Sequence, residues 1–308
     1  MDIKRNAHET DQAEKEYLSH YDIDKYSRPS VAVDMVIFSI QDDGVNDNIR
    51  KLPKKALKVL LIKRAKYPYK DYWALPGGFV RPGEDMAETA RRELYEETNV
   101  QNAYLQLVGA YGKKDRDPRG WIISNAFMAL VDGENYRLRA GTDAWEAEWF
   151  NIEIKAQEVR KELQGDTSLI ETDYHIYLSN EERDISASAG LRQYKSFQNY
   201  HETVRYEIVQ SEGLAFDHAE IILSAMLSLR GNTENDLRQA FDLMPEMFTL
   251  TQLQNVFEIV LDRELLTANF RRKIADYVVE TDIVSEGAGH RPAKLFKRNV
   301  RAFSVMEP

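Results

Sequence analysis

One stretch, from Gly78 to Val100, constrains the fold and the chemistry of this chain more than any other. A glycine turn and a proline-glycine turn are followed by a run of residues whose pattern predicts a helix. If Glu93 is set at zero and each residue advances by 100°, Glu97 lies at about +40° and Glu96 at about −60°. Three carboxylates therefore share one arc at the end of the predicted helix.

This crowding is unfavourable for a helix alone. Like charges three and four residues apart repel each other, and acidic side chains in the last turn oppose the helix dipole. For an isolated Glu-Glu pair, a solvated acidic helix end is the better interpretation. Here three acids lie on one arc after a Gly-Gly turn, and a hard divalent cation would relieve their repulsion. The pattern therefore predicts a metal site.

The order of fixed residues in this stretch resembles the box of the Nudix hydrolases. The pattern is Gly, five residues, Glu, seven residues, and then Arg-Glu-Leu-x-Glu-Glu-x-Gly followed by an apolar residue. One position departs from it, because Asn99 replaces the last glycine, and asparagine tolerates the left-handed geometry often needed after a helix. The residues that match are Gly78, Glu84, Arg92, Glu93, Leu94, Glu96, Glu97 and Val100.

The resemblance implies a hydrolase site that uses Mg²⁺ or Mn²⁺, in which water attacks phosphorus. It implies that Glu93 and Glu97 bind the metal beside the carbonyl of Gly77, and that Glu96 binds the metal or orients the water. The other implied catalytic residues are Arg92, which would pair with a catalytic carboxylate, and Glu84, which would support the site without binding the metal. The general base stays open, with Glu146 and Glu148 as candidates.

Length and composition limit the class of protein. A chain of 308 residues suggests two domains. It has no apolar run of about 18 residues, which predicts no membrane span, and its first residues form no apolar signal core. The absence of cysteine excludes disulfides and is compatible with a cytoplasmic protein, which is the location that we predict.

The charge is distributed unevenly. The formal charge of the whole chain is −10, which alone argues against binding to nucleic acid. Residues 267–301, however, hold eight basic and four acidic residues, a charge of 8 − 4 = +4, so the remainder carries −14. This asymmetry points to a basic surface near the C-terminal end.

The first two thirds of the chain predict an α+β fold. Residues 1–28 are polar and predict a tail or a peripheral helix. Apolar runs then predict strands near 31–40, 57–62, 103–111, 121–131 and 145–150. Few helices among them suggest a mixed sheet with helices on both faces, which is the α/β/α sandwich that the Nudix resemblance also implies. We place this domain at 29–230.

The least readable part of that domain is 151–213. Residues 152–163 suggest a short charged helix, whereas 174–178 and 204–209 suggest two strands that pair with each other. No catalytic pattern is present there. His175 and His201 are interpreted as surface or packing residues, because neither has a second ligand at helical or hairpin spacing.

The last part, 231–308, has the outline of a winged helix-turn-helix. A capping-box pattern at Asp217 predicts a helix that ends at Gly231, where we place the domain boundary. A second capping box at Thr249, a helix from Thr267 and a basic hairpin follow. In winged helices the second helix enters the major groove of DNA. A helical dimerisation module with ordinary surface charge is the alternative.

Basic residues on both the second helix and the hairpin favour double-stranded DNA as a partner, because neutralising phosphates requires several cations on one surface. A two-fold operator would also require a homodimer. The residues predicted to bind DNA are Asn269, Arg271, Arg272, Lys273, His290, Arg291 and Lys294.

The whole arrangement is similar to the Nudix-related transcriptional regulators of NAD metabolism and to their ADP-ribose pyrophosphatase relatives. The segments that carry this similarity are Asp115-Arg-Asp-Pro-Arg-Gly, Leu214-Ala-Phe-Asp-His-Ala-Glu220, Phe248-Thr-Leu-Thr-Gln-Leu-Gln254, Asn269-Phe-Arg-Arg-Lys273 and Gly289-His-Arg-Pro-Ala-Lys294. The similarity implies that the Nudix domain binds ADP-ribose or a related nucleoside diphosphate derivative, and that a dimer of winged helices binds operator DNA.

Three arginines are candidates for binding the phosphates or riboses of such a ligand, since guanidinium matches phosphate geometry: Arg64, Arg116 and Arg119. The four tryptophans, Trp73, Trp121, Trp145 and Trp149, are predicted to be core residues. Two hypotheses then remain for the protein. It is a ligand-sensing regulator with an intact hydrolase box, or it is an ADP-ribose pyrophosphatase whose last domain serves assembly.

Overall fold

The computed structural model describes residues 3–43, 54–101, 103–132, 144–198, 200–285 and 292–304. The chain forms two compact units, residues 1–30 and 31–308. The first unit contains the helix α1 (Ile3–His20) and the short 3-10 helix η1 (Ile23–Lys25), within the segment for which the sequence predicted a tail or a peripheral helix. Among the described residues, no helix is long and apolar enough to cross a membrane.

The second unit is built on one large mixed sheet whose strands run in the order β10-β9-β8-β7-β2-β1-β6-β5. Two short strands also belong to the sheet: β3 (Trp73–Ala74) pairs with β2, and β4 (Gly77–Phe79) pairs with β1. The long strands are β1 (Ser30–Asp42), β2 (Lys55–Arg64), β5 (Tyr104–Tyr111), β6 (Ile122–Asp132), β7 (Ala144–Gln164), β8 (Thr167–Asn180), β9 (Ile185–Gln198) and β10 (His201–Glu212).

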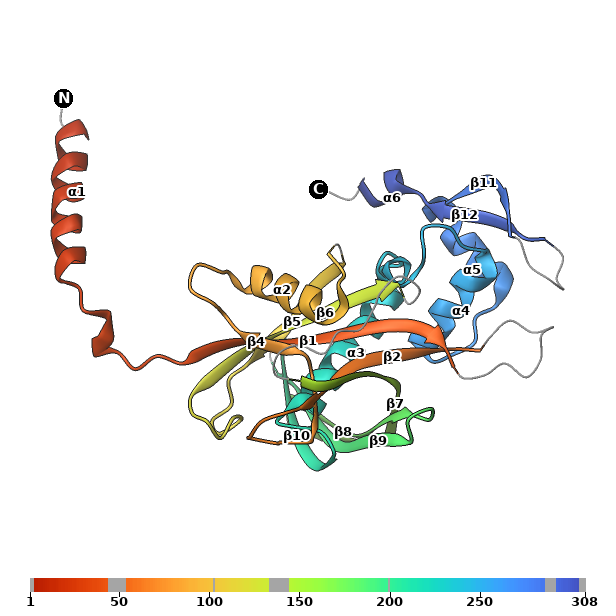
Figure 1. Ribbon diagram of the computed structural model, residues 1–308, viewed down its shortest axis with the longest axis horizontal. Helices are drawn as coiled ribbons and strands as arrows, with labels where there is room; N and C mark the ends of the chain where they lie inside the picture. Colours follow the sequence, from red (N-terminus) through yellow and green to blue (C-terminus); the bar gives the residue numbers. More distant parts are fainter. Residues whose placement is uncertain are drawn as a thin grey trace. The chain divides into compact units, whose positions relative to one another are not determined.

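Helices cover both faces of this sheet, as the sequence predicted (Figure 1). The helix α2 (Met86–Thr98) buries Ala90 and Leu94 against alternate residues of β1 and β2, including Met35 and Leu60. The helix α3 (His218–Asn235) packs on the other face. Because successive strand residues point to opposite faces, β1, β2, β6 and β7 divide their side chains between these two cores.

The region 151–213 differs from the prediction. Residues 152–163 are not a helix but the second half of the 21-residue strand β7. The predicted strands at 174–178 and 204–209 exist, but they do not pair with each other, because β9 lies between them. A helix was predicted because residues such as Glu162 favour helices. Pairing along the whole length of β8 outweighs that intrinsic propensity.

The helix α3 extends further than its sequence suggests. It continues to Asn235 instead of ending at Gly231. The predicted capping box at Asp217 is also wrong, because the Asp217 side chain makes no capping hydrogen bond. The domain boundary near residue 231 stays a prediction.

The last part has winged-helix architecture. Its helices are η2 (Gln239–Leu243), α4 (Leu250–Leu261), α5 (Thr267–Ile274), η3 (Ala275–Tyr277) and α6 (Val300–Ser304), and the wing is β11 (Val278–Val284) with β12 (Lys294–Arg298). The capping box at Thr249 is confirmed. The Thr249 hydroxyl accepts a hydrogen bond from the Gln252 backbone amide, and the Gln252 side-chain oxygen accepts one from the Thr249 backbone amide. Phe270 and Ile274 of α5 are buried, as their helical spacing predicted.

Candidate functional site

The box helix α2 begins and ends as its sequence specifies. Asp85 Oδ1 accepts from the Glu88 amide at 2.7 Å, and Glu88 Oε2 accepts from the Asp85 amide at 2.8 Å, which completes a capping box. At the other end Asn99 has φ 58° and ψ 18°, the left-handed conformation. Asn99 therefore performs the backbone role of the glycine that it replaces.

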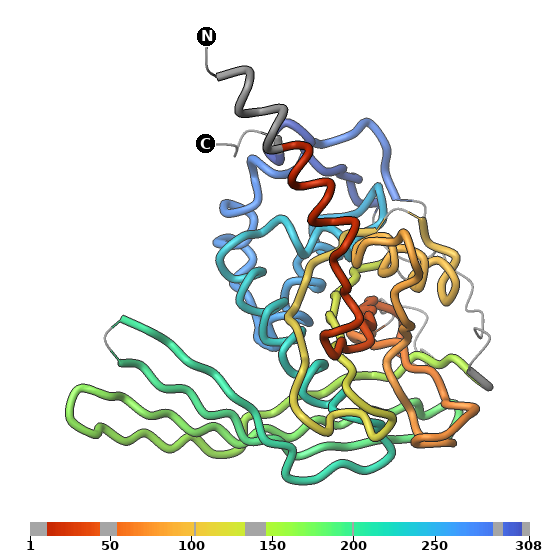
Figure 2. The backbone as a smooth tube through the Cα atoms, turned by 90° about the vertical axis from the view of Figure 1, so that its left-hand side faces the viewer, coloured from red at the N-terminus to blue at the C-terminus, as the bar shows by residue number. Residues whose placement is uncertain are grey.

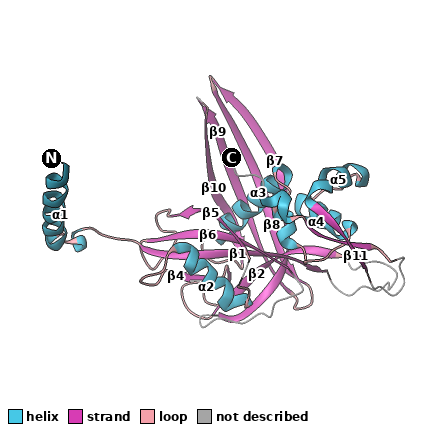
Figure 3. Cartoon of the chain, turned by 90° about the horizontal axis from the view of Figure 1, so that it is seen from above, coloured by secondary structure: helices cyan, strands magenta, loops and turns pink. Residues whose placement is uncertain are grey.

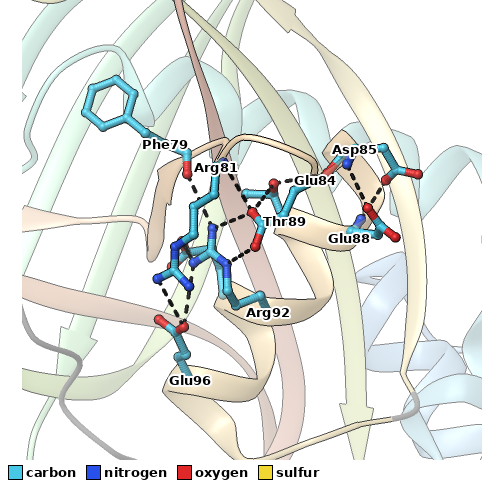
Figure 4. Close-up of polar contacts among 9 residues, drawn as sticks. Phe79, Arg81, Glu84, Asp85, Glu88, Thr89, Arg92 and Glu96 are labelled. Atoms are coloured by element: carbon cyan, nitrogen blue, oxygen red, sulfur yellow. Dashed lines mark hydrogen bonds and ion pairs between the residues drawn. The ribbon is translucent and has the colours of Figure 1, made fainter.

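Arg92 organises the acidic residues of the box (Figure 4). Its Nε and Nη2 donate to the two carboxylate oxygens of Glu84 at 2.9 and 3.0 Å, and its Nη1 donates to Glu93 Oε1 at 2.5 Å. Glu84 also accepts from the Thr89 hydroxyl at 2.9 Å. The predicted pairing of Arg92 with an acidic residue of the box is thus present in the structure.

The local environment shifts the pKa values of the Glu84 and Glu93 carboxyl groups in opposite directions. Hydrogen bonds from Arg92 lower the pKa of Glu84 to about 2. Burial raises the pKa of Glu93, and the nearby Arg92 guanidinium opposes that rise. Glu84 therefore acts as a fixed anion that orients Arg92, while the ionisation of Glu93 depends on positive charge beside it.

The Gly77-Gly78 turn lets the box helix approach the sheet closely. A Cβ atom on Gly78 would lie 2.3 Å from Glu93 Oε1, and one on Gly77 would lie 2.2 Å from the Val33 carbonyl oxygen. Neither position accepts a side chain without displacing its neighbours. The double glycine therefore brings β4 against the carboxylate of Glu93.

The acidic residues match a divalent cation in chemistry, since Mg²⁺ prefers carboxylate oxygens. Glu93 and Glu97 are buried one turn apart on α2. Over the described ranges, however, no three acidic or histidine side chains gather around one point. Glu96 is turned toward Arg81, at 3.5 Å, and Arg92 supplies the positive charge beside Glu93. Metal binding by these three acids and by Gly77 stays a prediction.

The two candidates for the general base lie on the face of the sheet away from α2. Trp149 packs in the core beneath α2, so the neighbouring Glu148, and Glu146 two residues before it, point to the opposite face. There both acids form ion pairs with Arg183. Both carboxylates are therefore engaged with Arg183, and the assignment of a general base stays a prediction.

The three candidate arginines meet at one pocket beside β4. Arg64, Arg116 and Arg119 all line this pocket of about 220 Å³, together with Gly77 and Gly78. Arg64 comes from the end of β2, whereas the other two come from the turn between β5 and β6. The fold therefore joins the box to arginines that are distant from it in the sequence.

These arginines have different surroundings. Arg116 is buried and donates to Asp217 at 2.8 and 2.6 Å and to Asp34 at 3.2 Å. Arg119 is about 43% exposed and pairs with the neighbouring Asp117 at 2.7 Å. Of these two, Arg119 has the more accessible guanidinium, while that of Arg116 is committed to two carboxylates.

Phe216 was missed by the sequence reading. Its ring lies 4.8 Å from the guanidinium carbon of Arg64 and 5.7 Å from that of Arg119. Phe79, which is 44% exposed, contacts Arg119 from another side at 5.4 Å. Alternating guanidinium and aromatic planes suit stacking on a flat ligand. Phe216 lies in the segment Leu214–Glu220 that carries the family similarity, but that segment alone did not assign it to the pocket, because its partners lie far from it along the chain.

His218, on the floor of the same pocket, is fully buried. Its Nδ1 accepts from the Leu75 amide at 2.9 Å, and its Nε2 lies 3.7 Å from Asp34. Burial lowers the pKa of His218, so the ring is neutral near pH 7. It joins the first turn of α3 to Leu75, between β3 and β4, and lies beside Asp34 of β1.

The tryptophan predictions held in part. Trp73 and Trp149 are core residues, but Trp121 is 57% exposed, and the side chain of Trp145 lies outside the described part of the chain. Trp121 follows a turn at the end of the sheet, where alternation no longer buries it. His175 and His201 are exposed, as interpreted.

The predicted DNA-binding side chains of α5 point outward. Asn269, Arg271, Arg272 and Lys273 are exposed, as is Lys294 on the wing. Arg272 Nη2 donates to Asn269 Oδ1 at 3.2 Å, and Lys273 Nζ lies 3.4 Å from the Glu234 carbonyl oxygen of α3. His290 and Arg291 lie outside the described residues. Contact of these residues with DNA stays a prediction.

Two regions of the chain match known protein families. Residues 50–165 match the model of the NUDIX domain, and residues 240–297 match that of the NrtR DNA-binding winged helix domain. Nudix domains generally use divalent metal ions. Residues from the sheet, α3, α4 and α5 belong to one continuous hydrophobic core, so the two matched regions pack together.

Relatives match over different lengths. The ADPR responsive transcriptional repressor NtrR of Acinetobacter baylyi is 31% identical over 288 residues, which cover 92% of this chain and 88% of that protein. An ADP-ribose pyrophosphatase of Methanocaldococcus jannaschii is 40% identical over 141 residues, covering 45% of this chain and 73% of the relative.

A solved structure extends the likeness to nearly the whole fold. It is a MutT/nudix family protein from Enterococcus faecalis, with a TM-score of 0.64 and 27% identity, and the match covers 94% of this chain and 93% of that one. The chain therefore belongs to the family of Nudix proteins with an NrtR-type winged helix that includes the A. baylyi repressor.

Proposed function

We propose that this protein is a transcriptional repressor that responds to ADP-ribose, binding that nucleotide in the pocket beside β4 and operator DNA through its winged helix. The observation that carries the proposal is the presence of both surfaces in one unit. Arg64, Arg119 and Phe216 frame a pocket beside the Nudix box, while Arg271 and Arg272 project from α5.

The pocket chemistry suits ADP-ribose. Guanidinium groups bind phosphate oxygens in two-point contacts, and the rings of Phe216 and Phe79 offer faces to an adenine. Glu93 lies against Gly78, which lines this pocket, and Mg²⁺ or Mn²⁺ held by Glu93 and Glu97 would neutralise a diphosphate. We place the protein in the cytoplasm and expect a homodimer on two-fold operators.

Hydrolysis of ADP-ribose is the second candidate function. It is favoured by the complete set of box acids and by the 40% identity to the pyrophosphatase. A metal ion bound there would supply charge neutralisation at the diphosphate, and the protein's own groups would hold the ligand in place. Steady-state turnover of ADP-ribose with Mg²⁺, lost in Glu97→Gln, would establish this activity, and absence of turnover in the wild type would exclude it.

The repressor function is tested with DNA from the region upstream of the gene for this protein. Fluorescence anisotropy should show sequence-selective, salt-dependent binding, and ADP-ribose should shift the affinity. The double change Arg272→Ala with Lys273→Ala should weaken binding at least tenfold. A matched control removes two exposed cations from the Nudix domain, Arg91→Ala with Lys114→Ala. Equal losses in both double variants would contradict the proposal.

A further inference from the structure

Arg81 is a cation of the box turn to which the Nudix pattern assigns no role, because it is one of the five residues that the pattern leaves open between Gly78 and Glu84. The turn leads into α2, which lies on the face of the sheet opposite α3 (Figures 2 and 3). The Arg81 amide donates to Glu84 Oε2 at 3.3 Å, and the Arg81 carbonyl oxygen accepts from the Glu84 amide at 3.0 Å. The backbone of Arg81 is therefore fixed in the turn, while its side chain is 59% exposed.

Two guanidinium groups flank the carboxylate of Glu96 (Figure 4). Arg81 Nη2 lies 3.5 Å from Glu96 Oε1, and Arg92 Nη1 lies 3.6 Å from the same oxygen. Arg92 Nη1 also donates to Glu93 Oε1 at 2.5 Å. Glu93 and Glu96 therefore converge on one nitrogen atom, and the two arginines supply the positive charge that a divalent cation would bring to these carboxylates.

The two arginines differ in how firmly they are held. The Arg92 side chain is 15% exposed, and it donates to both oxygens of Glu84 and to the Phe79 carbonyl oxygen. Among the described residues, the Arg81 side chain forms its one polar contact with Glu96, at the outer limit of a hydrogen bond. Exposed ion pairs of this kind contribute little to stability. Arg81 is therefore the cation that an incoming metal ion can displace, whereas Arg92 is held in the fold.

We propose that Arg81 is a positioning residue that lowers the affinity of the box for a divalent cation. Its guanidinium holds Glu96 in an ion pair, so a metal ion gains a Glu96 oxygen as a ligand only when this pair opens. A positive charge at the same place also repels the approaching cation. Removing the Arg81 charge should therefore strengthen the binding of Mg²⁺ or Mn²⁺ to the box.

Opening of the Arg81–Glu96 pair links metal binding to the nucleotide. In this respect the inference rests on the proposed function and on its metal site. A bound diphosphate brings oxygens that share the coordination of Mg²⁺, and it offers the released guanidinium another anion to pair with. Phe79, two residues before Arg81, lines the pocket beside β4. The box therefore holds a metal ion weakly without nucleotide and more tightly when a nucleotide is bound.

Titration of the full chain with Mn²⁺ alone tests the role of Arg81, with the free ion measured by electron paramagnetic resonance. Arg81→Ala should lower the dissociation constant for Mn²⁺ about fivefold, because it frees Glu96 and removes a repelling charge. Arg81→Lys keeps the positive charge, so its dissociation constant should stay within about twofold of the wild-type value. Unchanged thermal unfolding profiles would show that both variants are folded.

Two further variants show whether the effect is local and whether the ion binds at the box. Arg91 is exposed on α2 and lies about 160° around the helix axis from Glu93. Arg91→Ala changes the net charge as Arg81→Ala does but leaves the Arg81–Glu96 pair intact, so its Mn²⁺ affinity should equal that of the wild type. Glu97→Gln removes an expected metal ligand and should weaken Mn²⁺ binding at least about tenfold.

A double-mutant cycle tests whether Arg81 acts through Glu96. In a Glu96→Gln background, Arg81→Ala should change the Mn²⁺ affinity less than about twofold. A fivefold gain in that background, an equal gain in Arg91→Ala, or no gain in Arg81→Ala over the wild type would overturn the inference. If the wild type binds Mn²⁺ and Glu97→Gln weakens that binding, the metal site of the proposed function stands even then. No readout uses DNA or nucleotide, so each holds whether or not repressor activity is found.

Discussion

The guanidinium of Arg116 donates two hydrogen bonds to the carboxylate of Asp217, at 2.8 and 2.6 Å, across 101 positions of sequence. A third bond, to Asp34 at 3.2 Å, ties the same group to β1. Three segments, the turn before β6, the first turn of α3 and the central strand, therefore meet at one buried cation. This junction forms part of the wall of the ligand pocket.

Replacing that cation should destabilise the whole unit. Arg116→Met leaves Asp34 and Asp217 as buried carboxylates without their partner, which costs about 3–5 kcal/mol in the free energy of unfolding. Arg119→Met, in the same turn but 43% exposed at its side chain, should cost less than about 1 kcal/mol. Urea denaturation of the two variants measures the difference, and equal losses would show that the Arg116 junction is unimportant.

Arg119 should instead contribute to ligand affinity. Arg119→Ala removes a guanidinium that lines the pocket and faces Phe216, so the dissociation constant for ADP-ribose should rise about 10- to 100-fold. Isothermal titration calorimetry provides the measurement. Arg91→Ala, an exposed cation on the box helix, is the control, and its affinity should equal that of the wild type.

The Glu84–Arg92 pair should produce a defined pH dependence. Its folded-state pKa of about 2 lies below the ordinary 4.5, so the pair stabilises the fold fully above pH 4.5 and loses that contribution as the pH falls toward 2. Glu84→Gln should therefore lower the melting temperature more at pH 7 than at pH 3. A constant difference between wild type and variant across that range would refute the assignment.

The left-handed residue at the end of α2 predicts an unusual stabilising change. Asn99→Gly should raise the free energy of unfolding by about 0.5 kcal/mol, because glycine adopts positive φ without steric cost. Asn99→Ala should lower it by about 1 kcal/mol. Thermal unfolding of the three proteins gives the order Gly, Asn, Ala, and any other order would contradict the backbone argument.

Sequence reasoning succeeded where the determinants are local. The capping box at Thr249, the buried spacing of Phe270 and Ile274, and the left-handed Asn99 all depend on residues within a few positions of one another. Each could be read from short-range physics.

Sequence reasoning failed where a residue distant in the sequence determines the local structure. Asp217 has the sequence of a helix cap, yet its carboxylate binds Arg116 from another turn. Residues 152–163 carry helix-forming side chains, yet β8 holds them extended. The pocket beside β4 shows one success and one failure. Its arginines were predicted from their chemistry, whereas Phe216 was assigned to it only by the structure.

The helix α3 has a consequence for how this protein tolerates insertions. Its first turn meets the ligand pocket through His218, and near its last turn Glu234 meets Arg263 at 2.7 Å and Lys273 of α5. A helix of 18 residues is a rod of about 27 Å. One residue inserted midway would rotate everything after it by about 100°, whereas seven residues, nearly two turns, would restore the azimuth. The length of α3 therefore fixes the orientation of the winged helix relative to the pocket beside β4.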